Sequence, residues 1–193
     1  MYQKTRHLVL TALFIALVML LGFTPMGMIP LGFINVTILC LPVVIGTIVL
    51  GLKTGIILGF SFGTVSALSA FGIVGTPSSL AATLVAANPL LALVLCYVPR
   101  LLVPVTVCGV YKLVAAGKDE SRTALPFAAA AGSLCNTILY LGLMLLFYVM
   151  TGIEYANLLA LIGGTGLIAG ACEAIAAAVI TTPVVMALWK IYK

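Results

Sequence analysis

Charged side chains are scarce in this chain. Of its 193 residues, 7% are Asp, Glu, Lys or Arg, whereas 64% are hydrophobic. A soluble domain carries about a quarter charged residues, so the composition excludes a soluble protein. The alternating apolar and polar pattern of an outer-membrane barrel is absent as well. We therefore predict an all-α integral membrane protein, and we take its net charge of +5 as a sign of membrane topology rather than of nucleic-acid binding.

The residues that most enzymes need are also lacking. The chain has one histidine (His7), one aspartate (Asp119) and no G-x-x-x-x-G-K-[ST] phosphate-binding loop. Its five cysteines contain no C-x-x-C pair and lie within apolar segments, where packing is their usual role. We therefore expect no enzyme, no metal site, no disulfide and no cofactor in this chain.

The apolar segments predict six membrane-spanning helices in a single domain over residues 1–193. A helix needs about 20 apolar residues to cross the hydrocarbon. The predicted helices cover residues 7–23, 33–50, 54–71, 89–114, 124–150 and 158–188. Residues 24–32 form a turn rich in Pro and Gly, and residues 72–88 form a loop on one membrane face. The centre of that loop, residues 80–87, could be helical but is too short to cross.

Basic residues sort to one side of this predicted topology. Eight of the nine fall at the N-terminus, in the second and fourth loops or at the C-terminus: Lys4, Arg6, Lys53, Lys112, Lys118, Arg122, Lys190 and Lys193. The first, third and fifth loops contain no Lys or Arg. The positive-inside rule then predicts that both termini are cytoplasmic.

The ninth basic residue, Arg100, is the only charged residue in the 58 positions between Lys53 and Lys112. A guanidinium is not deprotonated in proteins. At the bilayer centre it costs at least ~2.5–3.5 kcal/mol, so it requires an acidic partner within the protein or an anionic ligand.

Other polar residues are predicted at a similar depth. With a rise of about 1.5 Å per residue, Asn136 and Glu173 lie near mid-membrane or in the outer half. Tyr140 shares a helix face with Asn136. These groups suit a small ligand with a carboxylate, an amide and hydroxyls in a pocket that opens outward. The candidate substrate-binding residues are Arg100, Asn136, Glu173, Tyr140, Asn35, Tyr97 and Asn88. The alternative is a buried Arg100–Glu173 ion pair that joins two helices, and both interpretations can hold together.

Small residues recur at helical spacing in two places. The third predicted helix has glycines four residues apart, at Gly51, Gly55, Gly59 and Gly63, and the first has Ala12 and Ala16. Such ridges let helices approach closely in lipid. We expect packing within the chain for the glycines. For the two alanines, a surface that contacts another membrane subunit is the alternative.

Together these features resemble the substrate-binding S component of energy-coupling factor (ECF) vitamin importers. The similar segments are Ala12-x-x-x-Ala16, FTPMGMIPLGFINVTILCLPVVIG, GLKTGIILGFSFG, VPRLLV, GSLCNTILYLG and GACEAIAAAVITTP. The last three are most similar to the pantothenate-specific branch. Cys40 departs from the pattern, since a larger polar residue is expected there.

The resemblance implies a subunit in the plasma membrane of a prokaryote that captures a vitamin, most specifically pantothenate, from outside. It implies partners as well: a transmembrane T component, contacted through Ala12 and Ala16, and two ATP-binding subunits that bind ATP and Mg. Toppling of the S component on the T component would carry the ligand inward. The loops around residues 23–32 and 72–88 would gate the pocket.

Three other functions remain open from the sequence. The same architecture could bind another vitamin or precursor, such as a hydroxymethylpyrimidine or pyridoxine. A stand-alone proton-coupled carrier would depend on Glu173 as its titratable group. A structural or assembly protein would bind no ligand and would use Arg100 and Glu173 as a packing pair.

Overall fold

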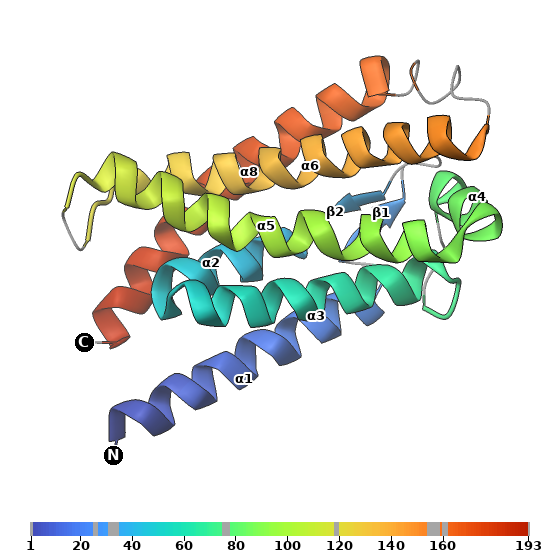
Figure 1. The fold of residues 1–193 in the computed structure, drawn as a ribbon. Coiled ribbons are helices and arrows are strands. Elements are labelled where there is room, and N and C mark those ends of the chain that lie inside the picture. Colours follow the sequence, from blue (N-terminus) through green and yellow to red (C-terminus); the bar gives the residue numbers. More distant parts are fainter. Residues whose placement is uncertain are drawn as a thin grey trace.

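The computed structural model of the chain describes residues 2–24, 27–30, 35–74, 78–117, 120–153, 159 and 162–192. Helices dominate it (Figure 1). In chain order the elements are α1 (Tyr2–Phe23), β1 (Met28–Pro30), β2 (Asn35–Thr37), α2 (Cys40–Leu50), α3 (Leu52–Ala70), α4 (Ser79–Ala87), α5 (Pro89–Ala115), α6 (Ala124–Thr151), the π-helical turn η1 (Ile162–Gly166) and α8 (Leu167–Tyr192).

Five of these helices are long and apolar enough to cross a membrane. They are α1, α3, α5, α6 and α8, with qualifying segments of 19 to 28 residues. They correspond to the first, third, fourth, fifth and sixth predicted helices, so the prediction of a helical membrane bundle is confirmed. The predicted short helix in the third loop is confirmed too, because α4 covers nine residues.

The second predicted helix, at residues 33–50, is wrong as a continuous helix. Residues 35–37 form strand β2, which pairs antiparallel with β1, and α2 has only 11 residues. Such a helix rises about 16 Å, which is too short to cross alone. Non-helical backbone is tolerated at membrane depth where protein surrounds it. The non-helical strand β2 contacts α8. The helix α2 that follows it contacts α1, α3, α5, α6 and α8 and buries residues 42–47.

The long helices run roughly along one axis, so the molecule has two distinct ends (Figure 1). The start of α1, the turn between α2 and α3, the connection from α5 to α6 and the C-terminus lie at one end. The short helix α4 and the end of α6 lie at the other. The basic residues that the structure describes outside the bundle centre all belong to elements at the first end: Lys4, Arg6, Lys53, Lys112, Arg122 and Lys190.

The glycine ridge of α3 packs against α5, as predicted for contacts within the chain. A Cβ atom built on Gly59 would lie 2.5 Å from the backbone oxygen of Arg100, and one on Gly63 would lie 2.7 Å from the Tyr97 ring. The Arg100 carbonyl has no helical N–H four residues later, since that position is Pro104. Glycine is therefore required at position 59 of α3. The two helix backbones approach each other there, at the Arg100 carbonyl, which lacks its usual helical N–H partner.

Gly59→Ala tests this close approach. We expect it to destabilise the protein by about 1–3 kcal/mol, the usual range for overpacking, since the rigid backbone of α5 cannot move aside like a side chain. The measurement is thermal unfolding in detergent, followed by helical circular dichroism. Gly109→Ala in α5 is the matched control, because nothing lies within 4 Å of a Cβ built there. It should be neutral or stabilise by about 0.5–1 kcal/mol. Equal melting temperatures for the two variants would contradict the packing argument.

Candidate ligand-binding site

Arg100 lies inside the bundle with 4% of its surface exposed. Its Nη2 donates a hydrogen bond to Ser66 Oγ on α3 (2.9 Å), and its Nη1 donates to the backbone oxygen of Leu95 on α5 (3.1 Å). Both acceptors are neutral. Hydrogen bonds in which one group is ionised are about twice as strong as neutral ones, so these two bonds stabilise the buried charge substantially.

The Leu95 carbonyl is available because of the proline four residues later. In a regular α-helix the N–H of residue 99 would bond to the carbonyl of residue 95. Pro99 has no N–H, and the arginine one position further along supplies the missing donor instead. The sequence Pro99-Arg100 is therefore a local unit, in which the proline frees the acceptor that the arginine uses.

Two aromatic rings complete the surroundings of the guanidinium. Its Cζ atom lies 4.6 Å from the ring centroid of Tyr140 on α6 and 5.2 Å from that of Phe62 on α3. A cation over a ring face is stabilised by about 0.5–2 kcal/mol, with the larger value in desolvated positions. Helices α3, α5 and α6 thus each contribute a group that stabilises the Arg100 charge.

Asn136 lies one helical turn before Tyr140 on the same face of α6. Gly132, one turn earlier still, packs against Val103 and Val107 of α5. Because Tyr140 lies over Arg100, Asn136 occupies the level between Arg100 and Val103. It is 5% exposed, and its Oδ1 atom has no hydrogen-bond partner among the residues that the structure describes.

The side chain of Glu173 on α8 contacts α6 at the level of Asn136, but on a different face of α6. Its Oε2 accepts a hydrogen bond from Thr137 Oγ1 (3.2 Å), and Gly170, one turn earlier, packs against the Thr137 side chain. Thr137 follows Asn136 directly in the chain. One layer of the bundle therefore contains the arginine, the asparagine and the glutamate.

Buried polar atoms without partners are concentrated in this layer. Among the described residues, three such side-chain atoms lack a hydrogen bond: Arg100 Nε, Asn136 Oδ1 and Thr181 Oγ1. An unsatisfied buried polar group costs about 1–3 kcal/mol, and more when it is charged. The layer thus offers one cationic donor and one amide acceptor, which complement a carboxylate and an N–H or O–H group.

Two predicted site residues, Tyr97 and Asn88, have other surroundings, and a third, Asn35, has a side chain that is not described. The hydroxyl of Tyr97 is 3.1 Å from Thr64 Oγ1 on α3, and its ring packs against Phe60. Asn88 is the N-cap of α5, where its Oδ1 accepts hydrogen bonds from the N–H groups of Leu90 and Leu91. Asn35 belongs to strand β2, and its side chain lies outside the described part of the chain. For these three residues, contact with a ligand stays a prediction.

Sequence analysis missed Ser66, Phe62 and Thr137. Phe62 and Ser66 are four residues apart, so they share a helix face, and both contact Arg100. The signal was present as a serine on the helix whose glycines were predicted to pack within the chain. Serine and threonine hydroxyls commonly bond across helices in membranes.

An apolar cluster separates this polar layer from the end of the bundle that carries α4. It contains Leu84 of α4, Ala92 and Leu95 of α5, and Met144, Phe147 and Tyr148 of α6. The Tyr148 hydroxyl donates to the backbone oxygen of Leu80 (2.8 Å), which fastens α4 to α6. In this structure α4 therefore covers the polar layer from that end.

Comparison with known proteins gives two matches. The family model described as "ECF transporter, substrate-specific component" matches residues 6–185. The pantothenic acid transporter PanT of Lactococcus lactis subsp. cremoris (strain MG1363) is 33% identical over 162 residues, which cover 80% of this chain and 78% of that protein. The family match includes all the residues of the polar layer.

Ser66→Ala tests the support of Arg100. We expect a loss of about 1.5–3 kcal/mol in unfolding free energy, the range for hydrogen bonds to charged groups, because Nη2 loses its acceptor inside the bundle. Ser61→Ala on the same helix is the matched control. Ser61 is also buried, but its hydroxyl donates only to the carbonyl of Ile57, one turn earlier. Similar losses for the two variants in detergent unfolding would show that Ser66 does not stabilise the guanidinium.

Proposed function

This chain belongs to the family of ECF transporter substrate-specific components, and from that premise we propose that it captures pantothenate for import. It is a multi-pass membrane transport subunit rather than an enzyme. The observation that carries the choice of ligand is the pair of unpartnered buried atoms, Arg100 Nε and Asn136 Oδ1. The first is a cationic donor and the second is a neutral acceptor, and both lie in the polar layer.

Pantothenate matches that pair chemically, since it has one carboxylate, one amide and two hydroxyls. Its carboxylate would accept a charge-assisted hydrogen bond from Arg100. Its amide N–H or one hydroxyl would donate to Asn136. Another hydroxyl would donate to Glu173. The name of the similar Lactococcus protein, a pantothenic acid transporter, supports the same ligand.

The ligand would enter from the end that carries α4. Helix α4 and its apolar contacts cover the polar layer there, so entry requires this cover to move. We propose that residues 72–88, together with residues 23–32, form the gate. The short length of α4 supports a movable cover, since it is held by the Tyr148 hydrogen bond and by the apolar packing of a few side chains such as Leu84.

Energy for transport would come from partner proteins. This chain has no phosphate-binding loop, so we propose that a T component and two ATP-binding subunits, which bind ATP and Mg, drive its toppling. Ala12 and Ala16 lie exposed on α1, which supports their proposed role as the contact with the T component. Small residues allow close helix approach in lipid.

We further propose six membrane crossings with both termini in the cytoplasm of a prokaryote. The second crossing would consist of β2 followed by α2. The placement of the basic residues at the end that carries the termini (Figure 1) supports this orientation through the positive-inside rule.

Reporter fusions test the topology. Green fluorescent protein fused at the N-terminus or at the C-terminus should fluoresce, because it folds in the cytoplasm. Alkaline phosphatase fused after Asn88 should be active outside. If β2 and α2 do not cross, five crossings remain and the two termini lie on opposite faces. Fluorescence from only one terminal fusion would therefore overturn the proposal.

Thermal stabilisation by a ligand panel tests the function. At one hundred times its dissociation constant, pantothenate should stabilise the purified chain by about 2.7 kcal/mol. Pantothenol, which has an alcohol in place of the carboxylate, should bind at least about 2 kcal/mol more weakly, since it leaves the Arg100 charge unpaired. Arg100→Lys should also weaken pantothenate binding, because lysine keeps the charge but loses the planar fork.

Arg122→Lys is the control for that substitution, since Arg122 is exposed and lies at the end away from α4. Equal binding of pantothenate and pantothenol would contradict the carboxylate contact. Stabilisation by a hydroxymethylpyrimidine or pyridoxine alone would keep the family and replace the ligand. No stabilisation of a folded sample by any vitamin would contradict the proposed function.

A further inference from the structure

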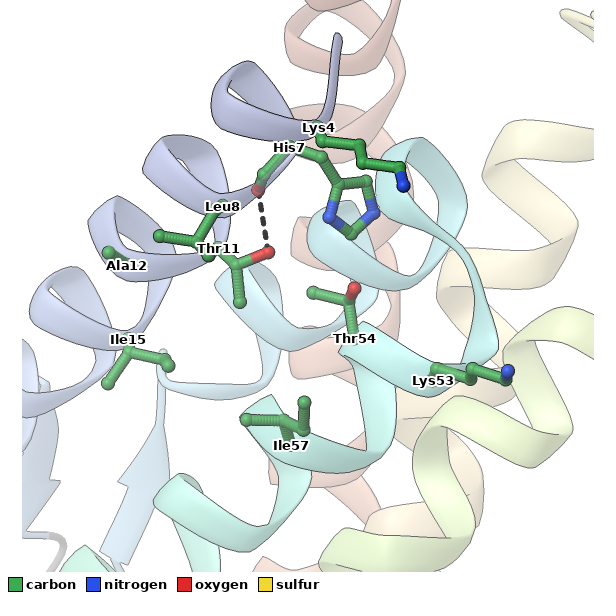
Figure 2. Close-up of a pocket in the computed structure, with 9 residues that line it drawn as sticks. All are labelled: Lys4, His7, Leu8, Thr11, Ala12, Ile15, Lys53, Thr54 and Ile57. Carbon is green, nitrogen blue, oxygen red and sulfur yellow. Dashed lines mark hydrogen bonds between the residues drawn. The ribbon is translucent and has the colours of Figure 1, made fainter. Parts of the chain in front are cut away.

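A groove lies between α1 and α3 at the end that carries the termini (Figure 2). It has a volume of about 810 Å³, within the range of small-ligand sites. Its lining residues are Lys4, His7, Leu8, Thr11, Ala12, Ile15, Lys53, Thr54 and Ile57. None of them is acidic. The groove is separate from the Arg100 layer, and nothing in the proposed mechanism of vitamin binding uses its lysines.

The groove is basic at one end and apolar at the other. Lys4 and His7 stand at the first turns of α1, whereas Ile15 and Ile57 lie further along α1 and α3 (Figure 2). Leu8 and Ile57 are 71% and 49% exposed, so the apolar part opens toward the surrounding hydrocarbon. This arrangement suits an amphiphile with a negatively charged head, whereas a soluble anion would leave the apolar part unused.

The positive charge of the groove has no acidic counterpart nearby in the sequence. The first 118 residues contain no Asp or Glu at all. His7 is engaged with the protein, since its Nε2 lies 3.2 Å from the backbone oxygen of Leu50 at the end of α2. Thr11 donates to the His7 carbonyl (2.8 Å). These contacts fix the wall of the groove and leave Lys4 and Lys53, both exposed, to interact with a ligand.

We propose that this groove binds one anionic phospholipid from the leaflet on the side of the termini. The lipid phosphate lies at Lys4 and Lys53, and an acyl chain lies along Leu8, Ile15 and Ile57. Basic pockets between membrane helices bind anionic headgroups in this way. The inference does not depend on which vitamin the chain binds.

The groove and the proposed T-component contact share Ala12 but differ in their other residues. Ala12 lines the groove, but Ala16, one turn further along α1, does not. Positive charge in the groove indicates a lipid rather than a membrane helix as its occupant, because a charged groove is a poor surface for apolar helix packing. A protein partner is therefore an outcome for the test to exclude.

Native mass spectrometry of the full chain tests the site with dioleoyl phosphatidylglycerol as the probe and dioleoyl phosphatidylcholine as the neutral reference. One bound phosphatidylglycerol should be retained, and Lys4→Gln with Lys53→Gln should weaken its binding by about tenfold or more. The matched control is Lys112→Gln with Lys190→Gln, which removes the same charge from exposed lysines at the same end of the bundle. It should change lipid affinity by less than twofold.

A second pair of variants tests the apolar part of the groove without altering charge. Ile57→Trp fills the groove and should reduce phosphatidylglycerol binding about as strongly as the double lysine variant. Ile56→Trp is the control, since Ile56 is the neighbouring residue, is 40% exposed and does not line the groove. Circular dichroism shows whether each variant is folded, and pantothenate-dependent stabilisation is recorded separately. Failure of the vitamin assay is then distinguishable from failure of this proposal.

Three results would overturn the proposal. Equal losses in the two lysine double variants would mean diffuse attraction to the charged end rather than a site. Equal retention of phosphatidylcholine would mean that the headgroup charge is not recognised. Unchanged lipid binding in the Lys4 and Lys53 variant, combined with lost assembly with the T component, would identify the groove as a protein contact.

Discussion

The rest of this structure depends on keeping one guanidinium charged inside an apolar bundle. Arg100 cannot lose its proton, so its surroundings must stabilise the charge. They do so with a serine hydroxyl from α3, a backbone carbonyl of α5 and ring faces from α3 and α6. Each group comes from a helix that packs against another of the set, and therefore the positions of α3, α5 and α6 are coupled to the position of one side chain.

Two prolines make this arrangement possible in the backbone. Pro99 frees the carbonyl of Leu95, which accepts from Arg100, and Pro104 frees the carbonyl of Arg100 itself. The second carbonyl faces Gly59, the only residue type that lets α3 approach so closely. Prolines within a membrane helix are tolerated where neighbouring groups satisfy the freed backbone. Here the arginine satisfies one of the two carbonyls, so the same short segment that introduces the charge also supplies an acceptor for it.

The polar layer was largely predictable, whereas several individual contacts were not. The depths of Arg100, Asn136 and Glu173 followed from the helical rise and from the sorting of basic residues, since both depend only on chain position. The second helix was wrongly extended because a continuous apolar run does not distinguish strand from helix, and β2 is defined by its antiparallel pairing with β1, which ends five residues earlier. The hydrogen bond between Tyr97 and Thr64 could not be predicted, because it depends on how α3 and α5 pack rather than on the position of Tyr97 along its own helix. The groove of Lys4 and Lys53 required the relative placement of two helices that are far apart in sequence.

The unpartnered atoms of the layer connect stability with ligand selection. Within the described part of the chain, Arg100 Nε and Asn136 Oδ1 are buried without hydrogen bonds. This costs free energy, and the proposed ligand would remove that cost on binding. A ligand that supplies a carboxylate and a donor gains that difference in addition to its own contacts. A neutral ligand of the same shape leaves the cation unpaired and gains less, because the site was organised around charge before the ligand arrived. The proposed selectivity for an anionic vitamin therefore depends on the same buried charge that couples the positions of α3, α5 and α6. Removing Arg100 would change the stability of the empty protein and the choice of ligand together.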